Sequence, residues 1–267
     1  MFILCKGELA KKPYIIPISE TPVYSLEELC YYMYHHIYSV TEEFFDEELV
    51  SWLCEQAGLE ALGEKMHVLL QKKNDLKDLV VTLLCSCDYY KEEEILQLVT
   101  VMKKIENLPA HEKNKIKADN YLRAGKYGRS LLEYKQLLYG EMAERFSTEE
   151  YGDLLHNQAI ALFHVSSFRE AANGFKEAYA RNHKEQSLQQ YLYALLLNGQ
   201  EEQFAQEGSS FGKTEEELGQ LRQNYIDAQT GGKDDGGEEE FISRCKNELR
   251  SAYLDGGVND GIPIVSQ

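Results

Sequence analysis

The stretch ADNYLRAGKYGRSLLEYKQLL, residues 118–138, decides the fold of this chain of 267 residues. Its apolar and small residues recur at three- and four-residue steps on both sides of Gly125, which predicts two helices joined by a turn. A second stretch, LLHNQAIALFHVSSFREAANGFKEAYARN, residues 154–182, repeats this pattern with a constant offset of 41 (159 − 118 = 41). The aligned residues are Ala118, Tyr121, Gly125, Tyr127, Ser130, Tyr134 and Leu137 in the first copy and Ala159, Leu162, Ser166, Phe168, Ala171, Phe175 and Ala178 in the second.

Each copy therefore predicts one helical hairpin with defined packing positions. The small residue of the first helix, Ala118 or Ala159, lets its partner helix approach closely. The aromatic residue after the turn, Tyr127 or Phe168, wedges between the two helices. Two matching hairpins predict a stack in which each unit buries its apolar face against the next.

These two stretches resemble the tetratricopeptide repeat, which has small, aromatic, Gly, aromatic, small and aromatic residues at these spacings. Lys117 and Gln158 depart from the family pattern where a large aliphatic residue is usual, and Asn114 departs where Trp or Leu is typical. The offset exceeds the family period of about 34 residues. The additional residues fall in 139–150, where Gly140 ends a helix and Ser147 with Glu150 caps the next. The resemblance implies an all-α fold of antiparallel hairpins stacked as a solenoid over residues 111–206.

A third, degenerate unit is expected from Gln186, with a first helix that ends at Gly199 and a short second helix around Phe204. Residues 207–229 are expected to hold a capping helix that starts at Thr214, because terminal units of solenoids are often atypical. Residues 230–267 are predicted to comprise a flexible linker with the sequence TGGKDDGG, a helix over 238–254 and a disordered tail.

The N-terminal part of the chain predicts a separate set of elements. Residues 2–5 and 14–18, within the segment 1–24, are short apolar runs that predict a small hairpin around Gly7 and the Lys11-Lys12-Pro13 turn. Residues 25–110 show the helical period in five segments. Ser25 is expected to cap the first, Thr41 to cap the second and Gly58 to end it. Nothing in the pattern decides whether these helices are diverged repeats or a separate bundle.

Composition excludes several classes of function. The formal net charge is −17, so phosphate backbones and anionic lipid surfaces are poor partners, and we expect neither nucleic acid nor membrane binding. Six cysteines without regular spacing predict free thiols in a reducing cytoplasm. No run approaches about 18 consecutive apolar residues, so we predict a soluble protein.

No pattern of catalytic or metal-binding residues is found. The sequence lacks the phosphate-loop, nucleophile-elbow, dinucleotide and HExxH motifs. His35 and His36 are adjacent, so on a helix they point about 100° apart and do not favour a shared ion. Most acidic clusters stand at first helical turns, where they complement the helix dipole. We therefore expect no catalytic residue, no metal ion and no cofactor.

The resemblance implies that the first helix of each unit lines a concave groove for a peptide or a partner helix. The residues that it places there are Lys115, Asp119, Leu122 and Arg123, then His156, Asn157, Ile160, Phe163 and His164, and then Gln189, Tyr193 and Leu197. The family's carboxylate clamp for chaperone tails is matched only at Lys115 and Asn157. Asp119 stands where that clamp needs an amide, so it would repel a terminal carboxylate.

The leading hypothesis is therefore a non-catalytic scaffold that binds a protein or peptide in this groove. The alternatives are an intracellular regulator that senses a peptide and, as a third hypothesis, an enzyme with an unrecognised site. The opposing structural interpretation is that the groove residues pack against the chain's own helices. The basic residues of 113–135 predict a positive face on the first repeat, open to an acidic segment. The sequence predicts no oligomeric state.

Overall fold

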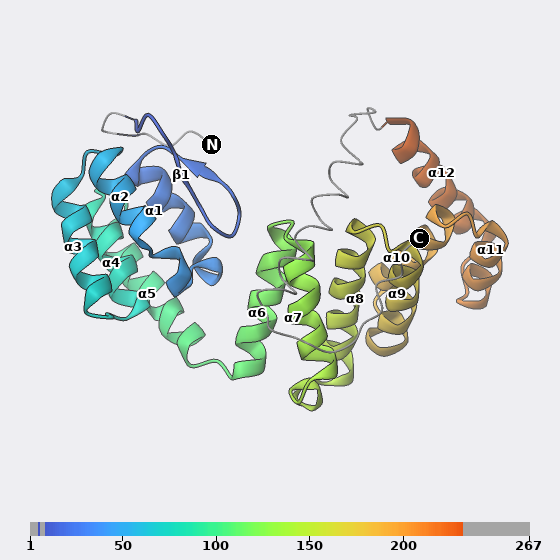
Figure 1. The fold of residues 1–267 in the computed structure, drawn as a ribbon. Helices are drawn as coiled ribbons and strands as arrows, with labels where there is room; N and C mark the ends of the chain where they lie inside the picture. The colour runs from blue at the N-terminus through green and yellow to red at the C-terminus, as the bar shows by residue number, and fades with distance from the viewer. Residues whose placement is uncertain (1–4, 6–8, 232–267) are drawn as a thin grey trace, which may run out of the picture. The chain divides into compact units, whose positions relative to one another are not determined.

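The computed structural model describes Cys5 and residues 9–231, with side chains to Ala228, and it is mostly helical. It divides into two compact units, residues 1–116 and 117–267 (Figure 1). The all-α class predicted from the sequence is confirmed, apart from one two-stranded antiparallel sheet. The predicted linker, helix over 238–254 and tail lie outside the described residues, except that the last described helix runs to Gly231.

The first unit opens with the sheet, formed by β1 (Tyr14–Ile15) and β2 (Pro22–Val23), in which Tyr14 stands opposite Val23. A short hairpin within residues 1–24 is present as predicted, and in it β1 pairs with β2, whereas the expected partner run 2–5 lies outside the described residues except for Cys5. The Tyr14 hydroxyl donates to the Phe44 carbonyl at 3.1 Å, and the Trp52 indole N–H donates to the Lys12 carbonyl at 2.9 Å. These bonds fix the sheet to the helices that follow.

Five α-helices with short connections follow the sheet in this unit, as predicted (Figure 1). They are α1 (Leu26–His35), α2 (Glu47–Glu55), α3 (Glu60–Gln71), α4 (Leu76–Ser86) and α5 (Glu92–Glu106), with 3-10 turns η1 (Ile37–Ser39) and η2 (Glu42–Phe44). Their apolar stripes meet in one buried cluster that includes Leu29, Leu49, Leu53 and Leu83, each fully buried. None of these short helices is stable alone, so this shared core supplies most of the stability of the unit.

Two helix starts test the predicted caps. Ser25 caps α1 as predicted, since its Oγ accepts from the Glu28 backbone N–H at 3.1 Å. The prediction that Thr41 caps the next α-helix is wrong. Thr41 precedes only η2, and α2 begins after Asp46, whose Oδ1 accepts from the Leu49 N–H at 2.8 Å. Asp46 provides the side-chain hydrogen bond to the helix start that Thr41 does not make.

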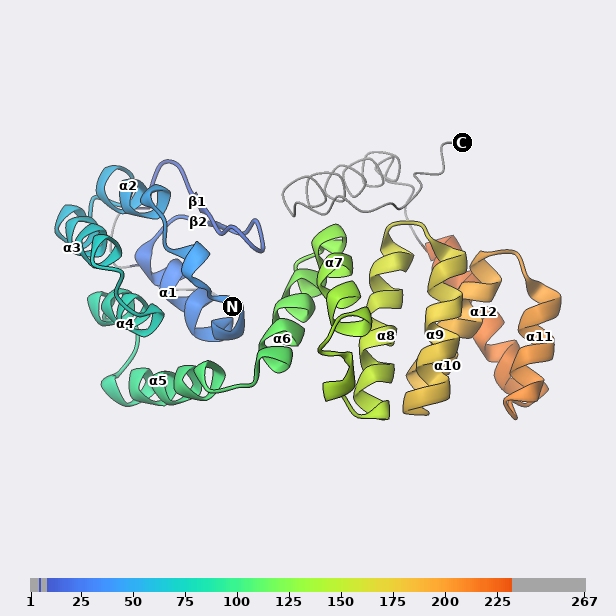
Figure 2. The same cartoon turned by 60° about the horizontal axis from the view of Figure 1, so that its bottom comes forward.

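The second unit is a run of helices, most of which pack against the next in the chain (Figure 2). They are α6 (Ala110–Arg123), α7 (Tyr127–Tyr139), α8 (Thr148–His164), α9 (Phe168–Asn182), α10 (Glu185–Leu197), α11 (Glu201–Ser210) and α12 (Glu215–Gly231), with a 3-10 turn η3 (Ala143–Arg145). The division between the units falls inside α6, after Ile116. Ser147 and Glu150 form the predicted capping box at the start of α8.

The small residues of both matching copies lie at close helix contacts. Ala118, Ala159, Ser130 and Ala171 are all fully buried. Ser130 Oγ donates to the Ala118 carbonyl at 3.1 Å, which joins α7 to α6. A Cβ atom added at Gly174 of α9 would lie 3.0 Å from the Ala159 Cβ of α8. Larger side chains at these positions would push the paired helices apart.

The third hairpin, α10 with α11, follows the second at an offset of 33 (192 − 159 = 33) and reverses the sizes of key residues. Leu192 and Phe204, both fully buried, stand where the second copy has Ala159 and Ala171. Gly208 stands where the second copy has a phenylalanine, and a Cβ there would lie 2.4 Å from Leu218 Cδ2 of α12. The Leu218 side chain of α12 therefore fills the space beside Gly208.

The predicted capping helix is present as α12. Thr214 and Glu217 form its capping box, with the Thr214 N–H donating to Glu217 Oε2 at 2.8 Å and the Glu217 N–H donating to Thr214 Oγ1 at 3.2 Å. Leu218 and Leu221 are buried against α10 and α11, while most of the described exposed residues of the helix are polar, with Ile226 as a large apolar one among them.

Candidate protein-interaction surface

Two hydrogen bonds place the first helices of the three hairpins side by side. Asn157 Nδ2 of α8 donates to Asp119 Oδ1 of α6 at 3.1 Å. Ser187 Oγ of α10 lies 3.0 Å from His156 Nδ1 of α8. The helix α8 therefore contacts both α6 and α10, and these three helices are here called the layer.

Asp119 is the polar node between α6, α7 and α8. Besides Asn157, the Tyr134 hydroxyl of α7 donates to Asp119 Oδ1 at 2.5 Å. Tyr134 is fully buried, and this burial, with the nearby Asp119 carboxylate, raises its pKa, so it remains a neutral donor. Asp119 and Asn157, both predicted to contact a ligand, are instead hydrogen-bonded to each other between the helices.

The resemblance placed His156 in the groove, but the residue is buried, at 8% exposure. Its ring contacts the Phe175 ring at 5.2 Å between centroids, and Nδ1 is paired with Ser187 Oγ. The prediction is wrong because the face of α8 that carries His156 is covered by α10. A buried imidazole with these neighbours holds two hairpins together.

Burial lowers the pKa of His156, with the Asp153 carboxylate opposing this shift and the Lys184 ammonium adding to it. The unfolded chain therefore binds a proton more readily than the folded one, and stability is full at neutral pH and falls as pH drops below the usual histidine value. We expect the melting temperature to fall between about pH 7.5 and about pH 5.5, and to fall less in His156→Leu. Differential scanning calorimetry of both proteins checks this.

The matched control is Gln158→Leu, because Gln158 is half-buried on the same helix and carries no titratable group. It should keep the wild-type dependence on pH. Equal dependence in wild type and His156→Leu would show that this imidazole does not carry the effect.

Sequence reasoning missed a polar cluster beside His156. Asn182 Nδ2 donates to Asp153 Oδ1 at 3.0 Å and to Ser187 Oγ at 3.1 Å, and Lys184 Nζ lies 2.6 Å from Asp153 Oδ2. The turn between α9 and α10 contains His183 in the left-handed region, with φ of 52°. The sequence signal for this cluster is Asn182 at the end of a predicted helix, directly before the residue that ends the helix. The cluster satisfies buried polar atoms and orients α10 on α8.

The exposed part of the layer is smaller than predicted and mainly apolar. Ile160 and Phe163 of α8 and Tyr193 of α10 are half-buried and pack at the edge of the core. The Phe163 ring contacts the ring of Phe168, the first residue of α9, at 5.1 Å between centroids. Gln189 lies one helical turn before Tyr193 and is half-buried. Leu197 lies one turn after Tyr193 and is 36% exposed.

Arg123 on α6 and His164 on α8 are polar members of the layer that remain exposed. Arg123 is exposed, and its Nη1 donates to Asn120 Oδ1 at 3.1 Å. The His164 ring stacks on Tyr127 at 4.2 Å, with an angle of 8° between the planes. Lys115 lies on the part of α6 that belongs to the first unit, so it is not assigned to this surface.

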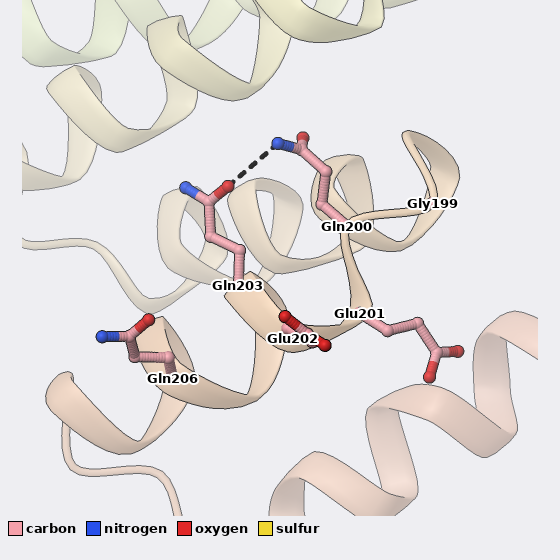
Figure 3. Close-up of a pocket in the computed structure, with 6 residues that line it drawn as sticks. All are labelled: Gly199, Gln200, Glu201, Glu202, Gln203 and Gln206. Carbon is pink, nitrogen blue, oxygen red and sulfur yellow. Dashed lines mark hydrogen bonds between the residues drawn. The ribbon is translucent and has the colours of Figure 1, made fainter.

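An open hollow of about 540 Å³ lies at the turn from α10 to α11 (Figure 3). Its lining comes from a single stretch of chain: Gly199, Gln200, Glu201, Glu202, Gln203 and Gln206. Gln200 Nε2 donates to Gln203 Oε1 at 2.9 Å across it (Figure 3). It contains none of the predicted site residues and offers no buried polar group to a ligand.

Within the described part of the chain, no three His, Cys, Asp or Glu side chains gather at a spacing that would hold a metal ion. In that same part, no helix has the length and apolar character needed to cross a bilayer. No family model, curated protein or solved structure matches this chain.

Proposed function

We propose that residues 111–206 form tetratricopeptide-type hairpins and that the protein is a non-catalytic interaction module. In this proposal the layer of α6, α8 and α10 receives a peptide or a helix from a partner protein. The free thiols of Cys5, Cys30, Cys54, Cys85 and Cys87 fit a reducing compartment, so the cytoplasm is the proposed location.

The observation that carries the proposal is the row of half-buried apolar side chains along α8 and α10. Ile160, Phe163 and Tyr193 pack on the core with one side and remain accessible on the other. An aromatic side chain that is already fixed by neighbouring rings loses little conformational entropy on binding, which makes Phe163 a suitable anchor. Surfaces of this kind bind an amphipathic segment through its apolar positions.

The polar groups of the layer define what such a partner offers. The carboxylate of Asp119 is occupied by Tyr134 and Asn157, so a partner's terminal carboxylate finds no clamp there. Arg123 is exposed at the α6 end and supplies a positive charge. The partner segment that fits best carries apolar side chains next to an acidic residue.

The test is affinity purification of the tagged protein from its native cells, comparing wild type with Arg123→Glu plus Phe163→Ala. We expect the variant to lose at least one specific partner that wild type retains, because the aromatic anchor is removed and the positive charge is replaced by a negative one. The matched control is Lys135→Glu plus Tyr139→Ala, which changes the same residue classes at exposed positions of α7. The control should retain every partner.

Equal partner lists for wild type and the groove variant would contradict the proposal. Loss of the same partner from both variants would contradict it as well, since the effect would then not belong to the layer. Circular dichroism of each variant confirms that the helices remain folded.

A further inference from the structure

Five aromatic side chains of the first unit form a closed circuit of ring contacts, here called the aromatic cluster. Its members are Tyr31, Tyr34, His35, Tyr89 and Tyr90. The Tyr31 ring lies 4.2 Å from that of His35, and the His35 ring lies 5.4 Å from that of Tyr34. Tyr34 stacks on Tyr90 at 4.2 Å, Tyr90 meets Tyr89 at 5.0 Å, and Tyr89 meets Tyr31 at 6.4 Å.

The core fixes the backbone beneath this cluster. Cys30 and Met33 of α1 are fully buried and fix this helix on the core. Tyr31 and His35 therefore lie on the side of α1 that is at the edge of the core. Cys87, also buried, anchors the connection from α4 to α5 that presents Tyr89 and Tyr90. The four tyrosines are half-buried and His35 is exposed, which leaves part of each ring accessible to solvent. The cluster is therefore a preformed surface of aromatic rings.

The charges around the cluster are mainly negative. Glu27 stands one helical turn before Tyr31, and Asp88 directly precedes Tyr89. Glu92 and Glu93 follow at the start of α5 and are exposed, with Lys91 as the basic residue among them. Residues 1–110 as a whole contain 10 basic and 19 acidic residues. This field attracts cations and repels acidic segments.

The ring faces themselves also favour a cation. Aromatic rings carry negative charge on their faces, and a guanidinium group placed over them gains electrostatic and stacking energy. The Tyr90 hydroxyl is buried and finds no hydrogen-bond partner among the described residues, so the cluster holds an unsatisfied polar atom.

We propose that the aromatic cluster binds an arginine side chain of a basic segment from a partner protein. Arginine fits better than lysine because its planar cation stacks on a ring while its N–H groups reach the flanking carboxylates. The aromatic cluster shares no residue with the layer of α6, α8 and α10. It favours a basic partner segment, whereas the layer favours an acidic one.

The test uses a fluorescein-labelled peptide of alternating arginine and serine, with fluorescence anisotropy as the readout at about 0.15 M salt. A lysine version should bind about 3- to 10-fold more weakly, and a citrulline version, which is planar but neutral, should lose at least about 10-fold. Equal binding of the citrulline version would overturn the proposal. Equal or tighter binding of an alternating proline and serine peptide would also overturn it, since the rings would then recognise proline.

The variants separate the cluster from the general acidity of the protein. Tyr31→Leu and Tyr89→Leu leave the net charge unchanged, and each should weaken the arginine peptide about 5- to 10-fold. The matched control is Tyr38→Leu, because Tyr38 is 50% exposed and is not part of the cluster. Wild-type affinity in both cluster variants, or an equal loss in the control, would overturn the proposal. Unchanged circular dichroism shows that the variants remain folded, and the two cluster variants provide independent readings.

Discussion

Replacing Phe204 by alanine is expected to lower the free energy of unfolding by about 3–5 kcal/mol, within the range for fully buried aromatic residues. Phe204 is fully buried on α11, and the guanidinium of Arg222 from α12 lies 5.4 Å from its ring centre. Its removal leaves a cavity between α10, α11 and α12 that these helices cannot close without losing other contacts. Urea denaturation followed by circular dichroism measures the change in midpoint.

The matched control for Phe204→Ala is Gln206→Ala, an exposed position on the same helix. This variant should stay within about 0.5 kcal/mol of wild type. Hydrogen exchange should also locate the faster opening of Phe204→Ala in α10, α11 and α12. A loss below about 1 kcal/mol would mean that α11 is not an integral part of the core.

Replacing Leu53 by alanine is expected to destabilise the first unit by about 2–5 kcal/mol. Leu53 is fully buried in the cluster that joins the sheet and the five helices. The buried clusters of the second unit share no residue with that cluster, so the two units have separate cores. Hydrogen exchange should therefore accelerate in α1 to α5 and stay unchanged in α8 and α9.

Glu55→Ala serves as the matched control for Leu53→Ala, since Glu55 is exposed on the same helix. It should leave hydrogen exchange in both units close to that of wild type. Equal acceleration in α8 and α9 after Leu53→Ala would show that the two units open together, in spite of their separate cores.

Most of the helices were predictable because their signals are local. The period of apolar residues, the caps at Ser25, Ser147 and Thr214, and the positive φ of Gly58 each depend on a few neighbouring residues. The start of α2 was misplaced because Thr41 and Asp46 compete as caps. The structure favours Asp46, which makes the side-chain bond.

The third hairpin was harder to place because its pattern of sizes is reversed. Leu192 and Phe204 stand at positions that are small in the other copies, and Gly208 stands at a position that is aromatic. Self-comparison rewards similar residues, so it identifies this unit only as a degenerate one, because a different helix completes its shape. Leu218 of α12 supplies the missing volume, and this compensation becomes visible only after the chain has folded.

The candidate site was predicted only in part, for a similar reason. Helical periodicity places His156 and Phe163 on α8, but it does not determine which neighbour covers each of them. In the structure α10 covers His156, whereas Phe163 remains half-buried at the edge of the core. The pairing of Asp119 with Asn157 and Tyr134 joins three helices that are separate in the sequence.

The sequence by itself determined the helical class, the limits of most helices and the two matching hairpins, because these depend on the spacing of residues within one or two helices. The tertiary structure alone decided which polar side chains are buried and which rings meet, as in the aromatic cluster formed by α1 and the connection before α5. Burial and ring contact depend on distances between elements, and a one-dimensional pattern does not specify those distances.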